Sequence, residues 1–437
     1  MPRHSKTHII AFPIQGWLGI RVFICFAWAY LLSYGIRAIN AIIAPDLIAE
    51  LHISNSTLGA MSAAYFVGFF LMQIPLGHWL DQYGSRKSES FLLLFSVVGA
   101  VIFAMADQIL ILTLGRCLIG MGVSACLMSA FTYYGRWFRP EHQGPLASAM
   151  LMCGTAGAML MTIPVQMALP IMGWRGIFWV LVIFLLIAVL GIRFGIPKAT
   201  DPITSSSTEE EKSTKPLAWL QGYIPIIKSG NFLQMLPMGV FNQGGFYAIQ
   251  TLWLGTWYRD VLQLSDSSVA SHLFTLNLVL LVGYAANMFI PRILNKKGIS
   301  TFTYAGILGG LSVAMEFFAV FLDPEYSSFF LLLFSLAATS FILAQSVFSQ
   351  FFPSSISGKA STSFNMLIFG GAIIVQWGIG FFIDKFMEHG LDKVEALTLA
   401  FKIMILCQVA SYIWMWLAPY VLKPSRFLMR VTEEPNH

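Results

Sequence analysis

The stretch Gln73–Lys87, QIPLGHWLDQYGSRK, recurs in altered form further along the chain as Asn287–Thr301, NMFIPRILNKKGIST. Both copies follow a long apolar run and turn through a glycine in a basic segment. The two glycines, Gly84 and Gly298, stand 214 residues apart. The chain therefore reads as two copies of one folding unit, and this repeat decides the fold.

A second pair of loops keeps the same spacing. RWFRPEHQGPLAS at 136–148 matches QFFPSSISGKAST at 350–362, with a Phe and a Gly shared at the offset of 214. Clusters of Ser, Asn and Asp at 53–59 and 264–270 precede corresponding apolar runs and are suited to capping helix N-termini. Two parallel halves related by an axis along the membrane normal are the layout of one large class of secondary transporters.

The composition excludes an ordinary soluble protein. Of 437 residues, 57% are hydrophobic and 11% are charged, and the mean hydropathy is +0.72. A soluble domain carries about 25% charged residues, so most of this chain must face lipid or lie inside a membrane bundle. The five cysteines all fall in apolar segments, which favours neither a disulfide framework nor a metal site.

Apolar length predicts the number of membrane spans. A spanning helix needs about 20 mostly apolar residues, and the chain offers twelve such stretches. We therefore expect an all-α membrane protein with twelve transmembrane helices in two pseudo-symmetric six-helix bundles. The predicted spans are 22–44, 57–80, 89–106, 109–137, 146–168, 174–196, 232–257, 269–294, 301–322, 327–351, 360–383 and 396–420.

Basic residues predict the orientation, because cytoplasmic loops of membrane proteins are enriched in Lys and Arg. With the N-terminus inside, the cytoplasmic segments hold 19 of the 26 Lys and Arg residues, the outer segments hold four, and three lie inside helices. Both termini are thus expected in the cytoplasm. The first apolar run has no small-residue cleavage site, so we interpret it as a retained span.

A polar stretch divides the chain. Residues 197–230 contain DPITSSSTEEEKSTK, which is too polar and too low in complexity to span a membrane or pack in a core. The predicted organisation is an N-terminal six-helix bundle at 1–196, a cytoplasmic linker at 197–230 and a C-terminal bundle at 231–437.

The segment GHWLDQYGSRK resembles the loop signature of the major facilitator superfamily, G-x-x-x-D-x-x-G-x-[RK]. The resemblance implies a gate latch, in which the motif acid caps the N-terminus of a helix of the second half, the eleventh, and pairs with an Arg. An acid at a helix N-terminus gains about 0.3–1 kcal/mol. The second copy has Asn295 in place of the acid, so the latch is asymmetric. The gate positions are Gly77, Asp81, Gly84 and Arg86.

The first predicted helix carries a narrower resemblance, to the anion:cation symporter branch of that superfamily. Tyr34, Arg37 and Pro45 stand at that branch's spacing. The resemblance implies that Arg37 binds a substrate carboxylate and that Tyr34 lines the site. Two positions depart from the branch, since Ile36 and Val123 replace its usual acids. Any coupling proton would have to bind elsewhere.

Arginines inside predicted helices are costly, by at least ~3 kcal/mol on insertion scales. Arg37 lies eight residues before Pro45, about 12 Å below the outer boundary. Arg116 fills the Arg position of LTLGRCLIGMG, which resembles the superfamily's fourth-helix pattern. Both arginines are expected near the central cavity, where they would favour an anion. The alternatives are a structural ion pair for Arg37 and bracing of helix backbones for Arg116.

Two further charges lie in predicted helices of the second half. Glu316 and Lys402 each stand seven residues from an outer helix end, so they are expected at similar depth, about 10 Å below the surface. The simpler interpretation is a structural ion pair between them. The alternative makes Glu316 a protonatable coupling site.

The seventh predicted helix should form the opposite wall of the cavity. Its segment PMGVFNQGGFYAIQTLWLG contains a Gly pair that favours local unwinding. Gln243, Tyr247 and Gln250 share one helical face. They could bind substrate or, alternatively, hydrogen-bond neighbouring helices. Further polar candidates on other helices are Asn277, Gln345 and Asn365.

These patterns predict a secondary transporter that moves a small organic anion, bearing a carboxylate or phosphate, by alternating access. The alternatives are a carrier or exporter of zwitterionic or amphipathic molecules, with Arg37 as a gate residue, and a transporter-like sensor. No Walker-A, HExxH or GxSxG motif suggests an enzyme. We expect a monomer in a bacterial inner membrane, in contact with lipid, the substrate and a coupling proton or other ion. We expect no cofactor, no metal and no nucleic-acid partner.

Overall fold

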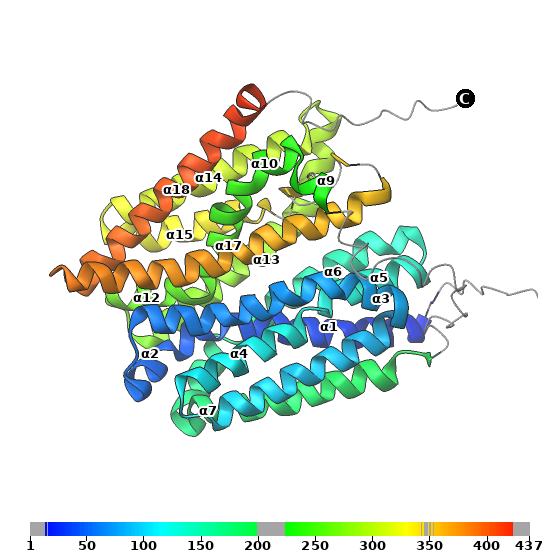
Figure 1. The fold of residues 1–437 in the computed structure, drawn as a ribbon, viewed down its shortest axis with the longest axis horizontal. Helices are drawn as coiled ribbons and strands as arrows, with labels where there is room; N and C mark the ends of the chain where they lie inside the picture. The colour runs from blue at the N-terminus through cyan, green and yellow to red at the C-terminus, as the bar shows by residue number, and fades with distance from the viewer. Residues whose placement is uncertain are drawn as a thin grey trace, which may run out of the picture.

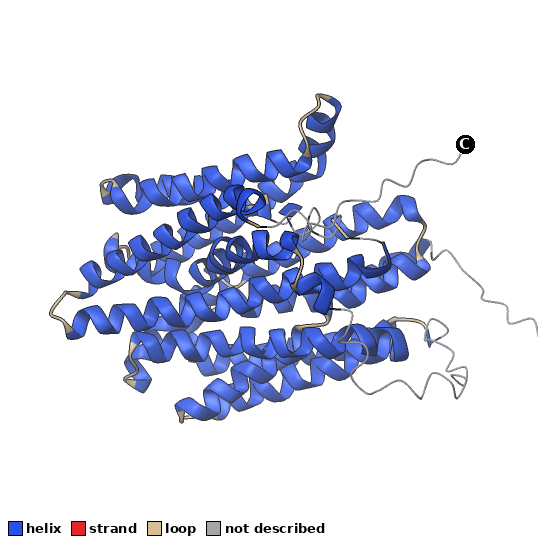
Figure 2. Cartoon of the chain, turned by 45° about the horizontal axis from the view of Figure 1, so that its top comes forward, coloured by secondary structure: helices blue, strands red, loops and turns tan. Residues whose placement is uncertain are grey.

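The computed structural model is built from helices joined by short loops in all the residues it describes (Figure 2). This agrees with the predicted all-α class. The described residues are 14, 16–198, 223–341, 343–344, 348, 351–352 and 354–422.

Helices of the first half occupy the lower part of the view in Figure 1, in blue to green-cyan. Two helical traces contain a sharp turn, and one of them carries two predicted spans, 57–80 and 89–106. One turn is at Gly84 in α3 and the other is at Gly173 in α7, and both have positive φ. The elements are α1 (Gly16–Ala38), α2 (Asn40–Leu51), α3 (Asn55–Met105), α4 (Ile109–Val123), α5 (Cys126–Trp137), α6 (Pro140–Leu160), α7 (Ile163–Leu190) and η1 (Gly191–Gly195).

Helices of the second half occupy mainly the upper part of the same view, in green to red. The predicted seventh span is the least regular, because short α-helical and π-helical segments alternate along it. The elements are α9 (Ile224–Ile227), α10 (Gly230–Pro237), η4 (Met238–Gly244), α11 (Gly245–Ala248), η5 (Ile249–Trp253), α12 (Leu254–Thr256), η6 (Trp257–Val261), α13 (Asp266–Lys296), α14 (Thr301–Phe321), α15 (Pro324–Ala338), α17 (Ser354–Glu388) and α18 (Lys393–Val421).

Eight helices of the described residues are long and apolar enough to cross a membrane. The described residues of each of the twelve predicted stretches are mainly helical, but four stretches do not appear as a separate long apolar helix. The stretch 57–80 is the first arm of α3, and 232–257 is the irregular run from α10. The other two, 146–168 and 327–351, correspond to shorter apolar helices, Pro145–Leu160 and Pro324–Ala338. The chain is a multi-pass membrane protein, and the count of twelve stays a prediction.

The repeated loops have matching backbones. Gly84 has φ of 78° and Gly298 has φ of 81°, a region that is strained for residues with a Cβ atom. The two capping clusters also match. Ser54 accepts a hydrogen bond from the Thr57 amide, and Ser265 accepts one from Ser268. The N-caps predicted from the sequence are therefore confirmed.

Contacts between the first and second sets of helices are most extensive along two pairs, α3 with α17 and α6 with α13. Close approach in the first pair needs glycine. A Cβ atom on Gly380 would stand 2.4 Å from the Asn55 carbonyl oxygen. The two sets thus meet along long helix faces, and the central site lies between them.

Candidate functional site

A cavity of about 100 Å³ lies between the two sets of helices. Its walls come from α1, α3, α6 and the junction of α4 and α5 on one side. On the other side they come from the irregular run η4–α11, and from α13, α15 and α17. The residues most relevant to recognition are Tyr30, Ser33, Arg37, Phe69, Gln73, Ser124, Gln243, Tyr247, Tyr284, Phe341, Asn365 and Phe369.

Arg37 is the charged side chain that lines this cavity. It is 5% exposed, and no acidic side chain of the described residues forms an ion pair with it. Aromatic rings surround the guanidinium and stabilise it through cation–π contacts. Its Cζ atom lies 4.6 Å from the ring centre of Tyr34, 5.1 Å from Tyr247, 5.8 Å from both Phe69 and Phe369, and 6.0 Å from Tyr65.

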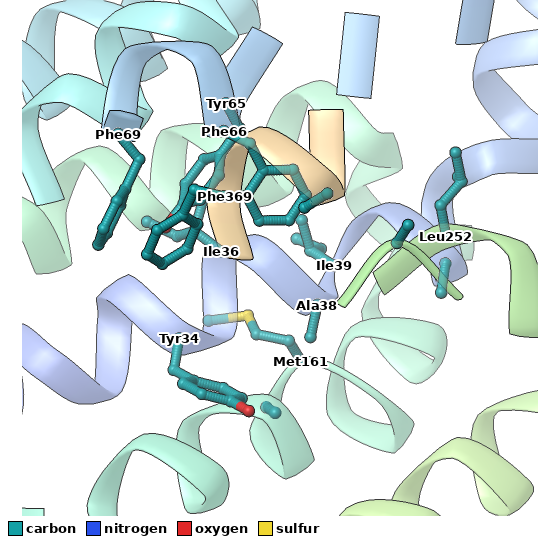
Figure 3. Packing of buried hydrophobic residues seen from close by; sticks show 14 of the residues in the cluster. Tyr34, Ile36, Ala38, Ile39, Tyr65, Phe66, Phe69, Met161, Leu252 and Phe369 are labelled. Atoms are coloured by element: carbon teal, nitrogen blue, oxygen red, sulfur yellow. The ribbon is translucent and has the colours of Figure 1, made fainter. Parts of the chain in front are cut away.

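Residues of both sets of helices build this aromatic cage. Figure 3 shows Tyr65, Phe66 and Phe69 from α3 gathered around Phe369 from α17. The ring centres of Phe69 and Phe369 are 4.2 Å apart, and Tyr247 stacks on Phe369 at 6.0 Å. The cage around the arginine is therefore complete only when the two sets of helices are closed together.

Local packing explains why Arg37 faces the cavity. Gly35 lies two residues earlier, on roughly the opposite side of α1 at about 100° per residue. A Cβ atom on Gly35 would stand 2.9 Å from the Gly157 carbonyl oxygen of α6. Because α1 presses its small face against α6, the arginine two residues on is turned to the centre of the bundle.

Tyr34 holds the arginine but is not among the residues that line the cavity. The sequence prediction placed it in the wall of the site. The structure places its ring beside Arg37, with the side chain 5% exposed and a hydroxyl that has no hydrogen-bond partner in the described residues. Figure 3 shows it next to Met161. Its position is that of a support for the guanidinium.

The structure does not bring Arg116 to the cavity, contrary to the prediction that it helps to bind substrate. It is 0% exposed, and its Cζ atom lies 4.4 Å from the ring centre of Phe103 and 5.0 Å from that of Phe178. The cause is the rotation of α4. Gly115 packs so closely on α3 that its Cβ atom would stand 2.9 Å from the Gly99 oxygen. This contact turns the next residue towards α3 and α7.

The polar residues of the seventh span divide between two roles. Gln243 and Tyr247 line the cavity, but the Gln243 side chain also donates a hydrogen bond of 2.6 Å to the Phe341 carbonyl oxygen. Gln250 does not line the cavity. Its amide donates to the Asn277 side chain at 3.0 Å, which joins two helices. For Gln250 and Asn277, the structure shows the alternative of helix–helix hydrogen bonding.

The remaining polar candidate that can be placed is Asn365, which lines the cavity from α17. Gln345 lies outside the described residues. Sequence reasoning missed Ser33 and Gln73, which also line the cavity. Helical spacing could have found Ser33, because it stands one turn before Arg37 on the same face of α1.

Glu316 and Lys402 do not form an ion pair in the described part of the chain. Glu316 is 0% exposed and neither of its carboxylate oxygens has a hydrogen-bond partner. The Lys402 ammonium instead lies 5.0 Å from the ring centre of Phe321. The predicted pairing is therefore not what the structure shows, because Lys402 is held by an aromatic ring.

A second fully buried acid was missed. Glu89 of α3 is 0% exposed, and both its carboxylate oxygens lack a partner. It is the first residue of the predicted span 89–106, so the sequence alone indicated a residue at the membrane boundary. The observed helix begins earlier, with a candidate span at Gln82–Met105.

The predicted gate loop is partly described. Gly84 makes its turn with φ of 78°, and Arg86 is 3% exposed and donates a hydrogen bond of 3.1 Å to the Arg193 carbonyl oxygen. A Cβ atom on Gly77 would have no neighbour within 4 Å. The Asp81 side chain lies outside what the structure describes, so the latch to the eleventh helix stays a prediction.

The opposite end of the bundle, beside Pro45, is held closed by a latch that the sequence did not suggest. The Asp384 carboxylate of α17 accepts hydrogen bonds from the backbone amides of Asn55 and Ser56, at 3.1 and 2.7 Å. The Asn55 side chain donates a third, at 3.0 Å. An acid of one set of helices thus caps the N-terminus of a helix of the other set, where a negative charge is favoured.

Arg259 adds a second link across the same end. Its guanidinium donates to the carbonyl oxygens of Ala41 at 2.9 Å and Ile42 at 3.3 Å, and it pairs with Asp266 at 2.7 Å. Gly255 makes the approach possible, since its Cβ atom would stand 2.6 Å from the Ala41 oxygen. The end beyond Arg37 is therefore closed.

The fold and the cavity define a multi-pass helical membrane protein with a central, cation-bearing site. The sequence model of the Major Facilitator Superfamily matches residues 26–376, and the chain belongs to that family. The superfamily predicted from the loop motif is thus confirmed. It is a family of transporters and not of enzymes.

Similar curated proteins are transporters of several solutes. The chain is 21% identical to the glucose transporter GlcP of Staphylococcus epidermidis, over 47% of its own length and 45% of that protein. It is 27% identical to the probable sulfoacetate transporter SauU of Cupriavidus necator, over 35% of each chain. It is 20% identical to the cis,cis-muconate transport protein of Acinetobacter baylyi, over 78% of this chain and 81% of that one. The first two matches thus span less than half of those relatives.

Solved structures share the fold. A bacterial homolog of the human lysosomal transporter Spinster, inward-facing and unoccupied, has a TM-score of 0.73 at 13% identity and covers 95% of this chain and 98% of that one. A D-xylose-proton symporter has a TM-score of 0.67 at 16% identity, with 91% and 97% covered. At such identities the likeness is one of fold.

Proposed function

We propose that this protein is a secondary transporter of a small organic anion, and that Arg37 binds the anionic group of the substrate. The observation that carries the proposal is a buried guanidinium in the central cavity without an acidic partner among the described residues. An ionised group at that depth is costly unless a counter-charge balances it. A carboxylate or phosphate would supply the charge and accept two parallel hydrogen bonds from the planar fork.

The surroundings support a compact anion. The cavity is about 100 Å³, and Phe69, Tyr247 and Phe369 form much of its wall. These rings exclude water from around the charge pair and so strengthen its attraction. Gln243 and Asn365 supply polar groups on the opposite wall. Two relatives that are named as transporters of cis,cis-muconate and sulfoacetate favour the same chemistry.

The movement we propose is alternating access between two rigid halves, 1–196 and 231–437. In the described conformation the Asp384 latch and the Arg259 bridge close one end. Transport would break these contacts and engage the Asp81 latch at the other end. With both termini in the cytoplasm of a bacterial cell, this closed end would face outward.

The test compares two buried arginines. Purified wild type, Arg37→Met and Arg116→Met would be screened by thermal shift against mono- and dicarboxylates, sugar acids, phosphate esters and amino acids. A ligand that binds the folded state raises the melting temperature. Liposome counterflow would then follow the ligand found. We expect Arg37→Met to lose both the ligand-induced thermal shift and the counterflow, and Arg116→Met to keep both. Counterflow at the wild-type rate in folded Arg37→Met contradicts the proposal.

A further inference from the structure

Glu89 is an acidic residue buried inside the first set of helices. The side chain is 0% exposed, and neither carboxylate oxygen has a hydrogen-bond partner in the described residues. It belongs to the helical segment Gln82–Met105, which is long and apolar enough to cross a membrane. An isolated carboxylate in such a place is so costly that the group takes up a proton instead. The neutral acid is the form that fits this site.

The polar groups around the carboxyl come from α5 and α1. The Ser129 hydroxyl and the Cys126 thiol of α5 face it, and both residues are 0% exposed. Tyr134 of α5 and Cys25 of α1 are two further titratable groups near it. None of these four side chains carries a charge at neutral pH. The pocket can therefore exchange a proton but cannot balance a carboxylate.

Basic residues of α3 and α1 do not hydrogen-bond the Glu89 carboxylate in the described part of the chain. On α3 itself, Arg86 is turned to the Arg193 carbonyl oxygen of η1 at 3.1 Å, and Lys87 lies two residues before the acid. On α1, Arg21 acts on the Cys25 thiol. None of these basic residues gives Glu89 a hydrogen-bond partner.

Two polar side chains, Cys126 and Ser33, lie between Glu89 and the central cavity. The Cys126 thiol faces both Glu89 and the Ser33 hydroxyl. Ser33 lines the cavity one turn before Arg37, and its hydroxyl reaches the Val123 carbonyl oxygen at 3.3 Å. The helix is interrupted there, because α4 ends at Val123 and α5 begins at Cys126. Glu89, through Cys126, and Arg37, through Ser33, therefore both lie beside the junction of α4 and α5.

We propose that Glu89 is the proton-binding site that couples a proton gradient to movement of the anion at Arg37. This inference rests on the proposed transport function. A proton from water on one side binds a carboxylate oxygen of Glu89, and the same proton is released to water on the other side. With the anion on Arg37 and the proton on Glu89, both buried charges are balanced before the halves rock. Neither ion then crosses alone.

The first experiment measures the protonation state of Glu89 directly. Infrared difference spectra of reconstituted wild type, Glu89→Gln and Glu316→Gln would be recorded across a pH titration. We expect wild type to show the carbonyl band of a protonated carboxylic acid, and Glu89→Gln to lose a band that Glu316→Gln retains. Glu316 is the matched control, because it is also fully buried and without hydrogen-bond partners. No band lost in Glu89→Gln means that Glu89 is ionised, which overturns the proposal.

The second experiment measures whether a proton gradient drives uptake, with labelled cis,cis-muconate as the probe in proteoliposomes. We expect Glu89→Gln to keep exchange but to take up the probe no faster with a proton gradient than without one. Glu89→Asp and Glu316→Gln should keep the stimulation. Stimulated uptake by Glu89→Gln overturns the proposal, and so does its loss in Glu89→Asp, which indicates a structural role. If wild type exchanges no muconate, this choice of substrate fails, while the infrared result still decides the protonation of Glu89.

Discussion

Replacing Asp384 by Asn should loosen the closed end of the bundle without unfolding it. The carboxylate accepts three hydrogen bonds from Asn55 and Ser56, two of them from backbone amides at the start of α3. Asparagine keeps one acceptor oxygen of nearly the same shape. The change therefore removes the negative charge and one acceptor, and leaves the packing in place.

The size of the effect follows from those contacts. Hydrogen bonds to charged groups contribute about 1.5–3 kcal/mol and neutral ones about 0.5–1.5 kcal/mol. A charge at a helix N-terminus adds about 0.3–1 kcal/mol. Because Asp384 is partly exposed, solvent screens it and the lower ends of these ranges apply. A loss of about 1–2 kcal/mol from the closed conformation lowers its population ratio roughly 5- to 30-fold.

The assay is a distance measurement across the closed end. Spin labels at Leu110→Cys and His389→Cys, both at exposed positions, report the separation of the two sets of helices in a cysteine-depleted background. We expect Asp384→Asn to move the distribution to longer distances. The matched control is Glu388→Gln, which removes an acid of the same helix that pairs only with Lys385 at 2.9 Å. An unchanged distribution in Asp384→Asn, or an equal shift in the control, refutes the reasoning.

Three further outcomes are expected. Arg37→Lys should lose most substrate binding, since a single ammonium cannot bond two oxygens in parallel, and wild-type affinity by thermal shift would contradict this. Arg116→Met should melt at the same or a higher temperature, because it removes a buried charge that has no hydrogen-bond partner; a large drop would contradict this. Burial raises the pKa of Glu50, but the Trp174 and Arg175 donors lower the pKa further, to below its usual value. The contribution of ionised Glu50 to the free energy of unfolding is therefore present at neutral pH and is lost as pH falls through the lowered pKa. Wild type and Glu50→Gln should differ in melting temperature near pH 7, by the equivalent of less than about 1 kcal/mol, and converge in acid.

The sequence by itself determined the class of the protein and the position of its most unusual charge. Its low charge content requires membrane burial, and the two glycine turns 214 residues apart reveal the repeat. The matching φ angles of Gly84 and Gly298 show why those residues had to be glycine. Arg37 stood out because a charge without a nearby acid is costly in lipid whatever surrounds it. These are local properties, and each can be seen in one segment at a time.

Only the tertiary structure decided which way the buried charges face and which residues they meet. Arg37 and Arg116 looked alike in sequence, yet one lines the cavity and the other lies between Phe103 and Phe178. Glu89 looked like a boundary residue, and Asp384 looked like an ordinary acid near a helix end. Their roles depend on helix rotation and on contacts between segments up to 329 residues apart. Close packing at glycines sets those rotations. The sequence pattern of a single helix does not indicate which helices pack against it.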